Sequence, residues 1–269
     1  RVDKVYDWIS TRSLRRLRDT VFLEGVRCGG GAHGGCQADC QLLWKEVWLG
    51  RVGGREAQPS EDGAEGAGLG RDAGMVAGLE LSALTTRIGT DPASLRYVCQ
   101  MTELPRALSS MSWNDPRHYL RDLASGNVRP GPFWTGLALR VFNVAQRRLG
   151  QAQFPVREHG GGGARQATAA EALGLRPGES VKVKSKREIE ATLDKEYRNR
   201  GLWFDADMMR FCGGLYRVSA IVSRQIDEKS GRMLSFSVPA VVLEDVTATG
   251  EYLAFALLNE RIYWRECWL

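Results

Sequence analysis

Apolar and polar residues alternate most clearly in the last third of the chain. After a Pro-Gly turn, Val181 and Val183 alternate with lysines as in a half-buried strand, and a short helix is expected over 186–193. Two β-rich runs follow on either side of a polar turn at 227–231, and then the strand-like run PAVVLEDV. Several short strands with one small helix predict a small SH3-like β-barrel over residues 175–269.

The beginning of the chain resembles this C-terminal module. VFLEGVRC from Val21 and WKEVWL from Trp44 correspond to VVLEDVTA from Val241 and WRECWL from Trp264. Shorter matches occur in the same order: Arg1-Val2 with Arg217-Val218, and Arg16-Leu17 with Arg232-Met233. Internal similarity of this kind indicates two copies of one module. We expect residues 1–49 to form the first copy, truncated at its start or completed by residues that this chain lacks.

Three segments separate the two modules. Residues 50–78 are rich in Gly, Ala and acidic side chains, which predicts a flexible linker. Residues 79–150 are expected to be mainly helical, with helices over 115–123 and 132–149. Residues 151–174 contain a tetraglycine and are expected to be a linker with a short helix. The predicted fold class is α+β, with two related small SH3-like β-barrel modules and a helical middle region.

The segment RCGGGAHGGCQADC carries the most specific chemical signal. Cys28, His33, Cys36 and Cys40 fall within thirteen positions, and thiolate and imidazole are preferred ligands of zinc and of iron–sulfur clusters. We expect Cys36 and Cys40 to lie on the first turns of a helix that runs to Leu49, with both sulfurs on one face. The amide groups at the start of such a helix would lower the pKa of these thiols. The loop glycines would allow Cys28 and His33 to fold over it.

Other interpretations of these residues stay open. Cys99 is an alternative fourth ligand in place of His33, which would favour a four-cysteine cluster. The loop is otherwise a flexible glycine-rich segment with partly buried thiols, or it carries a disulfide such as Cys28 to Cys40. The equivalent stretch of the second module offers no thiol before Cys267 and no histidine. The second module is therefore expected to lack the metal.

The repeated endings also carry a tryptophan pattern. Trp44, Val47 and Trp48 fall at helical spacing, as do Trp264 and Trp268. This spacing predicts a buried stripe in each module. An aromatic and basic surface that binds nucleic acid is the alternative.

Composition limits the classes of protein to which the chain can belong. It has 269 residues, of which 43% are hydrophobic and 26% charged, close to the average of soluble domains. No apolar run is long enough to span a membrane and no signal peptide is visible, so we expect a cytoplasmic protein with reduced cysteines. The net charge of +5 favours anionic partners. Because basic residues are interleaved with acidic ones, nucleic-acid binding is possible but not favoured.

The motifs together resemble an uncharacterised bacterial family. They are the Cys, His, Cys, Cys loop leading into WKEVWL, and the second-module stretches VKVKSKREIEATLD, NRGLWFDADM, FCGGLYRV and WRECWL. The family is associated with gene neighbourhoods for secondary metabolites or polysaccharides, and the resemblance covers both ends and part of the middle. It transfers no activity and no catalytic residue. In that family the second module also holds cysteines near its end, a feature from which LLNERIYWREC departs.

These observations lead to two functional hypotheses. The first is a soluble metal-binding protein of a biosynthetic pathway, holding zinc or, alternatively, an iron–sulfur cluster. It would act on a small or carrier-bound metabolite, as a metalloenzyme such as an oxidoreductase or as the partner of an enzyme. The second is a nucleic-acid-binding or regulatory module with a structural zinc.

Overall fold

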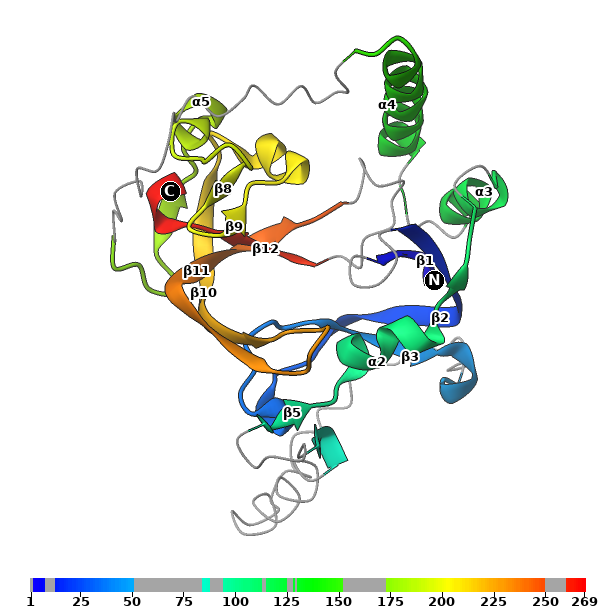
Figure 1. Cartoon of the computed structure of the whole chain (residues 1–269), viewed down its shortest axis with the longest axis horizontal. Coiled ribbons are helices and arrows are strands. Elements are labelled where there is room, and N and C mark those ends of the chain that lie inside the picture. Colours follow the sequence, from blue (N-terminus) through cyan, green and yellow to red (C-terminus); the bar gives the residue numbers. More distant parts are fainter. Residues whose placement is uncertain are drawn as a thin grey trace, which may run out of the picture.

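The chain is a mixed α+β protein with two sheet modules and a helical middle region (Figure 1). The predicted linker over 50–78 and nearly all of the one over 151–174 lie outside the part of the chain that the structure describes. The computed structural model describes residues 2–7, 13–50, 84–87, 94–112, 115–124, 128, 130–151, 173–249 and 260–269.

The first module is an antiparallel sheet around one long strand. In this sheet β2 (Ser13–Arg27) lies between β1 (Val2–Asp7) and β3 (Gln41–Lys45). The short strand β6 (Ser109–Ser110), from the middle region, also pairs with β2. The buried core cluster is small and includes one residue of the middle region: Val5, Leu17, Leu43 and Met101. The first module is therefore stabilised in part by packing against the middle region.

The second module has four antiparallel strands in the order β12-β11-β10-β7. They are β7 (Ser180–Lys182), β10 (Leu215–Ile226), β11 (Met233–Thr247) and β12 (Arg261–Trp264). Between β7 and β10 the chain forms a cap, which consists of α5 (Lys186–Glu190), β8 (Arg198–Asn199), β9 (Leu202–Trp203) and the 3-10 helix η5 (Ala206–Phe211). The cap and the sheet enclose the main core, whose large members include Ile189, Phe204, Leu243, Trp264 and Trp268.

Several sequence predictions for the second module are confirmed. A strand begins at Ser180, and the backbone amide of Asp227 bonds to the carbonyl of Arg232 at 2.8 Å in the predicted turn between β10 and β11. The helix predicted from Lys186 begins there because Ser185 and Glu188 form a capping box. It ends at Glu190, three residues before the predicted end.

The two sheets repeat one strand pairing at a constant offset of 220 residues. Corresponding pairs are Val21 with Trp44 and Phe22 with Leu43 in the first module, and Val241 with Trp264 and Val242 with Tyr263 in the second. The 3-10 helices that follow, η2 (Glu46–Trp48) and η7 (Glu266–Trp268), obey the same offset. Both modules also carry a positive φ at the equivalent positions Gly25 and Asp245. The stretches VFLEGV and VVLEDV therefore occupy the same place in two similar sheets.

The shorter sequence matches are misaligned. Val2 pairs with Thr20, and Val222 with Ala240, so Val2 corresponds to Val222 rather than to Val218. The Arg-Val dipeptides at 1 and 217 are thus four positions out of register.

The prediction of a helix from Cys36 to Leu49 is wrong. Residues 41–45 form β3, which pairs with β2, and only a single 3-10 turn follows. Trp44 is half-buried, while Val47 is 86% and Trp48 64% exposed, so the predicted buried stripe is absent from the first module. Trp264 and Trp268 are both buried, on a strand and a 3-10 helix. β3 pairs with β2 and β12 pairs with β11, and this strand pairing outweighs the helical spacing of the tryptophans in the sequence.

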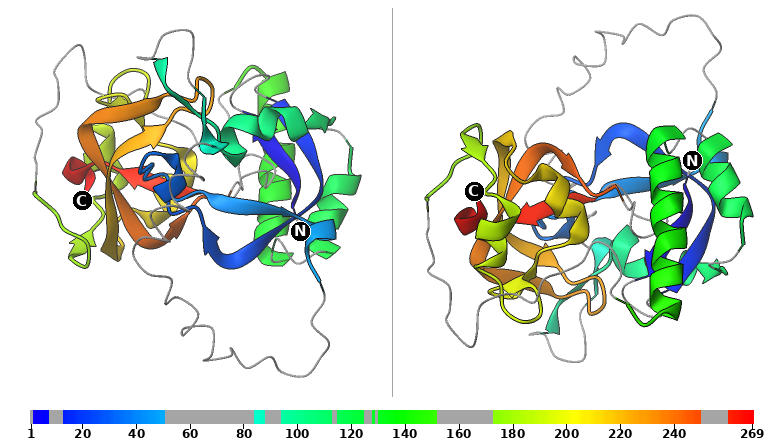
Figure 2. Two further views of the ribbon diagram at one scale, coloured as in Figure 1. Left: turned by 90° about the horizontal axis from the view of Figure 1, so that it is seen from below. Right: turned by 90° about the horizontal axis from the view of Figure 1, so that it is seen from above.

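The middle region supplies three helices. They are α2 (Gln100–Ala107), α3 (Arg117–Ala124) and α4 (Pro130–Arg148), and all three lie with the first module (Figures 1 and 2). The helices predicted over 115–123 and 132–149 are thus confirmed to within two residues. The middle region also contains two short strands, β4 (Thr86–Arg87) and β5 (Arg96–Tyr97), which pair with each other.

The described sheets are open, and no closed barrel is formed by them. The SH3-like class of the two modules therefore stays a prediction. Among the described residues no helix is long and apolar enough to cross a membrane. The hairpin of β10 and β11 reaches from the second module towards β2 and β3 (Figure 1), and the cysteine-rich loop meets it there.

Candidate metal centre

Residues 28–40 form the loop between β2 and β3, referred to below as the cysteine loop. The backbone amide of Cys28 bonds to the carbonyl of Cys40 at 2.8 Å and closes its base. A short 3-10 helix, η1 (Gly31–His33), lies within it. Cys36 and Cys40 therefore belong to irregular backbone, and the loop's own turns bring the thiols together.

Three glycines determine the path of the cysteine loop. Gly30, Gly34 and Gly35 all have φ near +60° to +75°, a region that favours glycine. A Cβ atom at Gly30 would overlap the carbonyl of Cys36, and one at Gly34 would overlap the Tyr97 ring. The amide of Gly35 bonds back to the carbonyl of Gly30 at 2.9 Å. The turns of the loop are thus tightly wound.

The loop is held by the second module. The side-chain oxygen of Gln37 accepts hydrogen bonds from the amides of Ser223 at 2.8 Å and Arg224 at 3.1 Å, both on β10. The amide of Gln37 donates to the carbonyl of Arg224 at 3.1 Å. The amide of Ile226 lies 3.3 Å from the sulfur of Cys36, which accepts this hydrogen bond. The position of Cys36 therefore depends on residues almost two hundred positions away.

All five candidate ligands line one small cavity. Its volume is about 140 Å³, and its lining includes the four predicted ligands and the alternative fourth: Cys28, His33, Cys36, Cys40 and Cys99. The sulfur of Cys28 lies 3.7 Å from Nδ1 of His33. Two such ligands on one tetrahedral zinc would be about 3.6 Å apart. A weak thiol–imidazole hydrogen bond accounts for the same distance without a metal.

The remaining ligands lie farther apart than a bound metal requires. Among the described residues, no three histidine, cysteine, aspartate or glutamate side chains are arranged as a ligand group. All six cysteines are free thiols, and no disulfide joins Cys28 to Cys40. Metal binding in this cavity would therefore require the ligand side chains to move closer together.

The thiols are electrostatically unlike those of a helix N-terminus. Burial raises the pKa of Cys28 and of Cys40, and the neighbouring thiols and carboxylates raise it further. The expected lowering by helix amides is wrong because residues 36–40 form no helix. A metal bound here would displace thiol protons, as at other thiolate sites.

Cys99 reaches the cavity from the middle region. It precedes α2, and its thiol packs with Cys40 against the core of the first module. Cys212 and Cys267 pack instead against the core of the second module. In that module Ala248 and Glu260 stand where the first has Cys28 and Cys40 at the offset of 220, and the amide of Ala248 bonds to the carbonyl of Glu260 at 2.9 Å. Neither equivalent position supplies a thiol or an imidazole.

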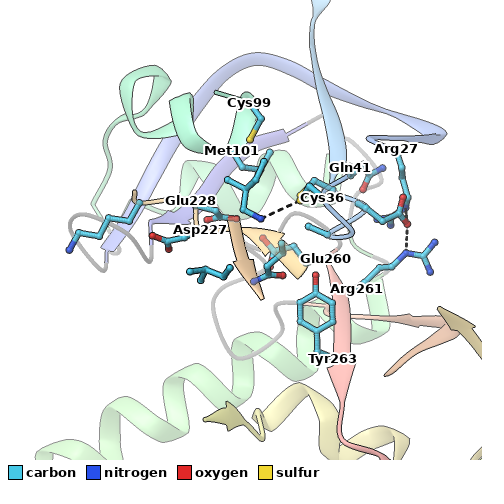
Figure 3. Close-up of a pocket in the computed structure, with 17 residues that line it drawn as sticks. Arg27, Cys36, Gln41, Cys99, Met101, Asp227, Glu228, Glu260, Arg261 and Tyr263 are labelled. Carbon is cyan, nitrogen blue, oxygen red and sulfur yellow. Dashed lines mark hydrogen bonds and ion pairs between the residues drawn. The ribbon is translucent and has the colours of Figure 1, made fainter. Parts of the chain in front are cut away.

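A larger cavity of about 490 Å³ adjoins the thiols. Cys36, Cys40 and Cys99 line both cavities, so the larger one opens onto the candidate metal centre. Cys36, Cys99 and Met101 approach it from one side, and Asp227, Glu228, Glu260 and Tyr263 from the other (Figure 3). These second-module residues were not predicted from the sequence. No local motif marks them, and the signal was only that Glu260 occupies the position equivalent to Cys40.

The charges in this cavity are unevenly paired. Asp39 is bonded to Arg261 and lies 4.0 Å from Nε of Arg27, so the two arginines of the lining share one carboxylate. Desolvation raises the pKa of Glu228 to about 7, and Glu260 and Asp227 add to the effect. The pKa of Tyr263 is also raised, first by burial and then by Cys40. Glu228 is nonetheless exposed at the rim of the cavity, so solvent screens these charges and reduces the effect.

Comparison with known proteins gives no family for this chain. No family model, no curated protein and no solved structure matches it. The resemblance described from the sequence motifs thus stays a prediction. The function is inferred below from the geometry of the two cavities.

Proposed function

We propose that the cysteine loop binds a metal through Cys28, His33, Cys36 and Cys40. The observation that carries this proposal is that all four side chains, which come from separate turns of one loop, line the same 140 Å³ cavity. The 3.7 Å separation of Cys28 and His33 supports it, because it is close to the spacing of two ligands on one zinc.

Zinc is the first candidate and an iron–sulfur cluster the alternative. A zinc with four protein ligands would be structural, fixing the loop against β10, whereas an iron–sulfur cluster would supply electron transfer. Cys99 lines the same cavity and is the alternative fourth ligand in place of His33. A four-cysteine set would favour the cluster.

We further propose that a small or carrier-bound metabolite occupies the larger cavity. Its volume of about 490 Å³ falls within the usual range of ligand sites. Cys36 and Cys40 line both cavities, so a metabolite there would lie beside the metal. Glu228, with a pKa of about 7, could hold or transfer a proton at neutral pH. A role in a cytoplasmic biosynthetic pathway, as an enzyme or the partner of one, is consistent with reduced thiols.

Elemental analysis and a visible absorption spectrum of protein purified without oxygen test the metal. About one zinc per chain and no colour is expected for a zinc site, and iron with sulfide and a brown colour for a cluster. The Cys36→Ser, Cys40→Ser variant should lose the metal, and the matched Cys212→Ser, Cys267→Ser variant should retain it. Absence of metal from the unaltered protein would refute the proposal.

A second pair of variants identifies the fourth ligand. If His33 is the ligand, His33→Ala lowers metal content and affinity while Cys99→Ser leaves both unchanged. The reverse result assigns Cys99. Replacement of the true ligand should lower metal affinity by about 10-fold or more. Mutation of a group that only hydrogen-bonds to a metal ligand already lowers affinity by about 10–100-fold.

Nucleic-acid binding with a structural zinc remains the alternative function. Carboxylates line the large cavity, and their negative charge would repel the phosphate backbone of a nucleic acid. The alternative predicts binding to nucleic acid that weakens steeply as salt is raised. A titration of labelled single- and double-stranded DNA and RNA at two salt concentrations distinguishes the two functions.

A further inference from the structure

The turn that ends the first module carries an uncovered apolar face. This face, referred to below as the Trp48 face, consists of Val47, Trp48 and Leu49, which are 86%, 64% and 37% exposed. Three consecutive exposed apolar side chains, one of them tryptophan, are characteristic of a surface that binds another polypeptide. No described residue covers them.

In the second module the residues equivalent to the Trp48 face are covered by other parts of the chain. At the offset of 220 the equivalent residues are Cys267, Trp268 and Leu269, and Trp268 is fully buried. The Phe204 ring packs edge-on against Trp268 at 5.6 Å, and the Trp268 indole N–H donates to the hydroxyl of Thr192 at 2.8 Å. Both partners belong to the cap that precedes β10.

Backbone contacts complete this cover. The amide of Lys184 bonds to the carbonyl of Trp268 at 2.8 Å, and its ammonium group bonds to the carbonyl of Cys267 at 2.9 Å. The carboxylate of Glu266 accepts from the amides of Leu173 and Gly174 at 2.7 and 3.2 Å. Residues 173–214 thus cover the turn with a ring, a hydroxyl and hydrogen bonds to its backbone.

We propose that the Trp48 face is the docking surface for a polypeptide of the same design as residues 173–214, which comprise β7 and the cap. The register that β2 and β3 share with β11 and β12, together with the equivalence of Val2 and Val222, carries this inference. Val2 corresponds to Val222, so a cap that ends at the equivalent of Ile221 would lead directly into β1. The cap would place an aromatic ring against Trp48 and a hydroxyl beside its indole nitrogen, as Phe204 and Thr192 do for Trp268.

An extended chain tests the proposal. A second copy of residues 173–221 replaces Arg1 and leads into Val2 of the otherwise complete protein. Hydroxyl-radical footprinting read by mass spectrometry measures the reactivity of individual tryptophans. In the unextended chain Trp48 should be oxidised readily and Trp268 hardly at all. In the extended chain the reactivity of Trp48 should fall to the level of Trp268.

A matched control separates specific docking from simple proximity. Phe204→Asp in the added copy alone should restore the reactivity of Trp48. The proposal is overturned if Trp48 stays reactive in the extended chain, if the added copy is degraded by protease while the rest stays folded, or if the control remains protected.

Sedimentation of the unextended chain tests whether a second copy of the chain occupies the Trp48 face. A dimer that Trp48→Lys abolishes would also overturn the proposal.

Discussion

Single residues in the cysteine loop decide whether its thiols can meet. Gly30 is the most constrained, because its φ is +71° and a side chain there would overlap the carbonyl of Cys36. Gly31 has an ordinary φ and open space around the position of a Cβ atom. The two neighbours therefore provide a matched pair in which only one glycine is required.

The Gly30→Ala variant should lose metal binding, whereas Gly31→Ala should retain it. The left-handed backbone alone costs a non-glycine residue about 1–2 kcal/mol, and the overlap with Cys36 adds to it. Metal content by elemental analysis and chemical denaturation measure the two effects. Equal behaviour of both variants would show that the path of the loop does not form the site.

The Glu228 carboxylate should make stability depend on pH. Its folded pKa of about 7 lies above that of an unfolded glutamate, so ionisation opposes folding as pH rises from about 4.5 through 7. Glu228→Gln should therefore be more stable than the unaltered protein at pH 8 and equal to it at pH 4.5. The gain should be about 1 kcal/mol or less, because the Glu228 side chain is exposed and solvent screens its charge.

Thermal unfolding from pH 4.5 to 8 checks this expectation. Glu24→Gln, an exposed glutamate on β2, is the control for the change in net charge. A difference between the Glu228 variant and the unaltered protein that does not change with pH would contradict the argument.

At the scale of elements, the same strand and turn occur twice in different surroundings. β3 with η2 and β12 with η7 have similar sequences and the same register. In both, the amide of the final leucine bonds to the carbonyl of the glutamate at the start of the turn. Only the second pair lies beneath a cap. The exposed or buried state of the tryptophan therefore follows from the neighbouring element and not from the local sequence.

Alanine substitution of the two equivalent tryptophans should have unequal effects. Trp268→Ala removes a fully buried ring and should lower the free energy of unfolding by about 3–5 kcal/mol. Trp48→Ala removes a ring that is 64% exposed and should change it by about 0.5 kcal/mol or less. Urea denaturation of both variants makes the comparison. A large loss from Trp48→Ala would mean that the ring is covered in solution.

At the scale of the whole molecule, the candidate centre depends on how the modules meet. Gln37 makes four hydrogen bonds to β10, three through its side-chain oxygen and one through its backbone amide, and Asp39 is bonded to Arg261 at the start of β12. Figure 2 shows the first-module strands and the β10–β11 hairpin side by side in two further views. Both cavities are lined from more than one of these parts.

Gln37→Ala should loosen this junction without unfolding either module. Loss of its side-chain hydrogen bonds should cost about 1 kcal/mol, which corresponds to roughly fivefold faster exchange of the amides that it holds. Hydrogen–deuterium exchange should show this at Ser223 and Arg224. The amide of Val218 on the same strand, which bonds to Glu179, should be unchanged. Unchanged exchange at Ser223 would exclude the loop as the element that fixes β10.

The sequence by itself determined the elements whose signals are local. Alternation predicted the strands of the second module, local sequence patterns predicted α3 and α5 to within three residues at each end, and the repeated motifs indicated the equivalence of the two endings. It also identified the five side chains that line one cavity. These features depend on neighbours within a few residues, or on direct comparison of two stretches.

Only the tertiary structure decided the rest. WKEVWL has helical spacing, yet pairing with β2 makes its start a strand, because hydrogen bonds to a distant strand outweigh weak local propensity. The cap alone separates buried Trp268 from exposed Trp48. Glu228 and Tyr263 join the thiols because two modules meet, and no motif within either module encodes that meeting. Burial and proximity depend on contacts between segments far apart in the chain, and a linear pattern does not contain them.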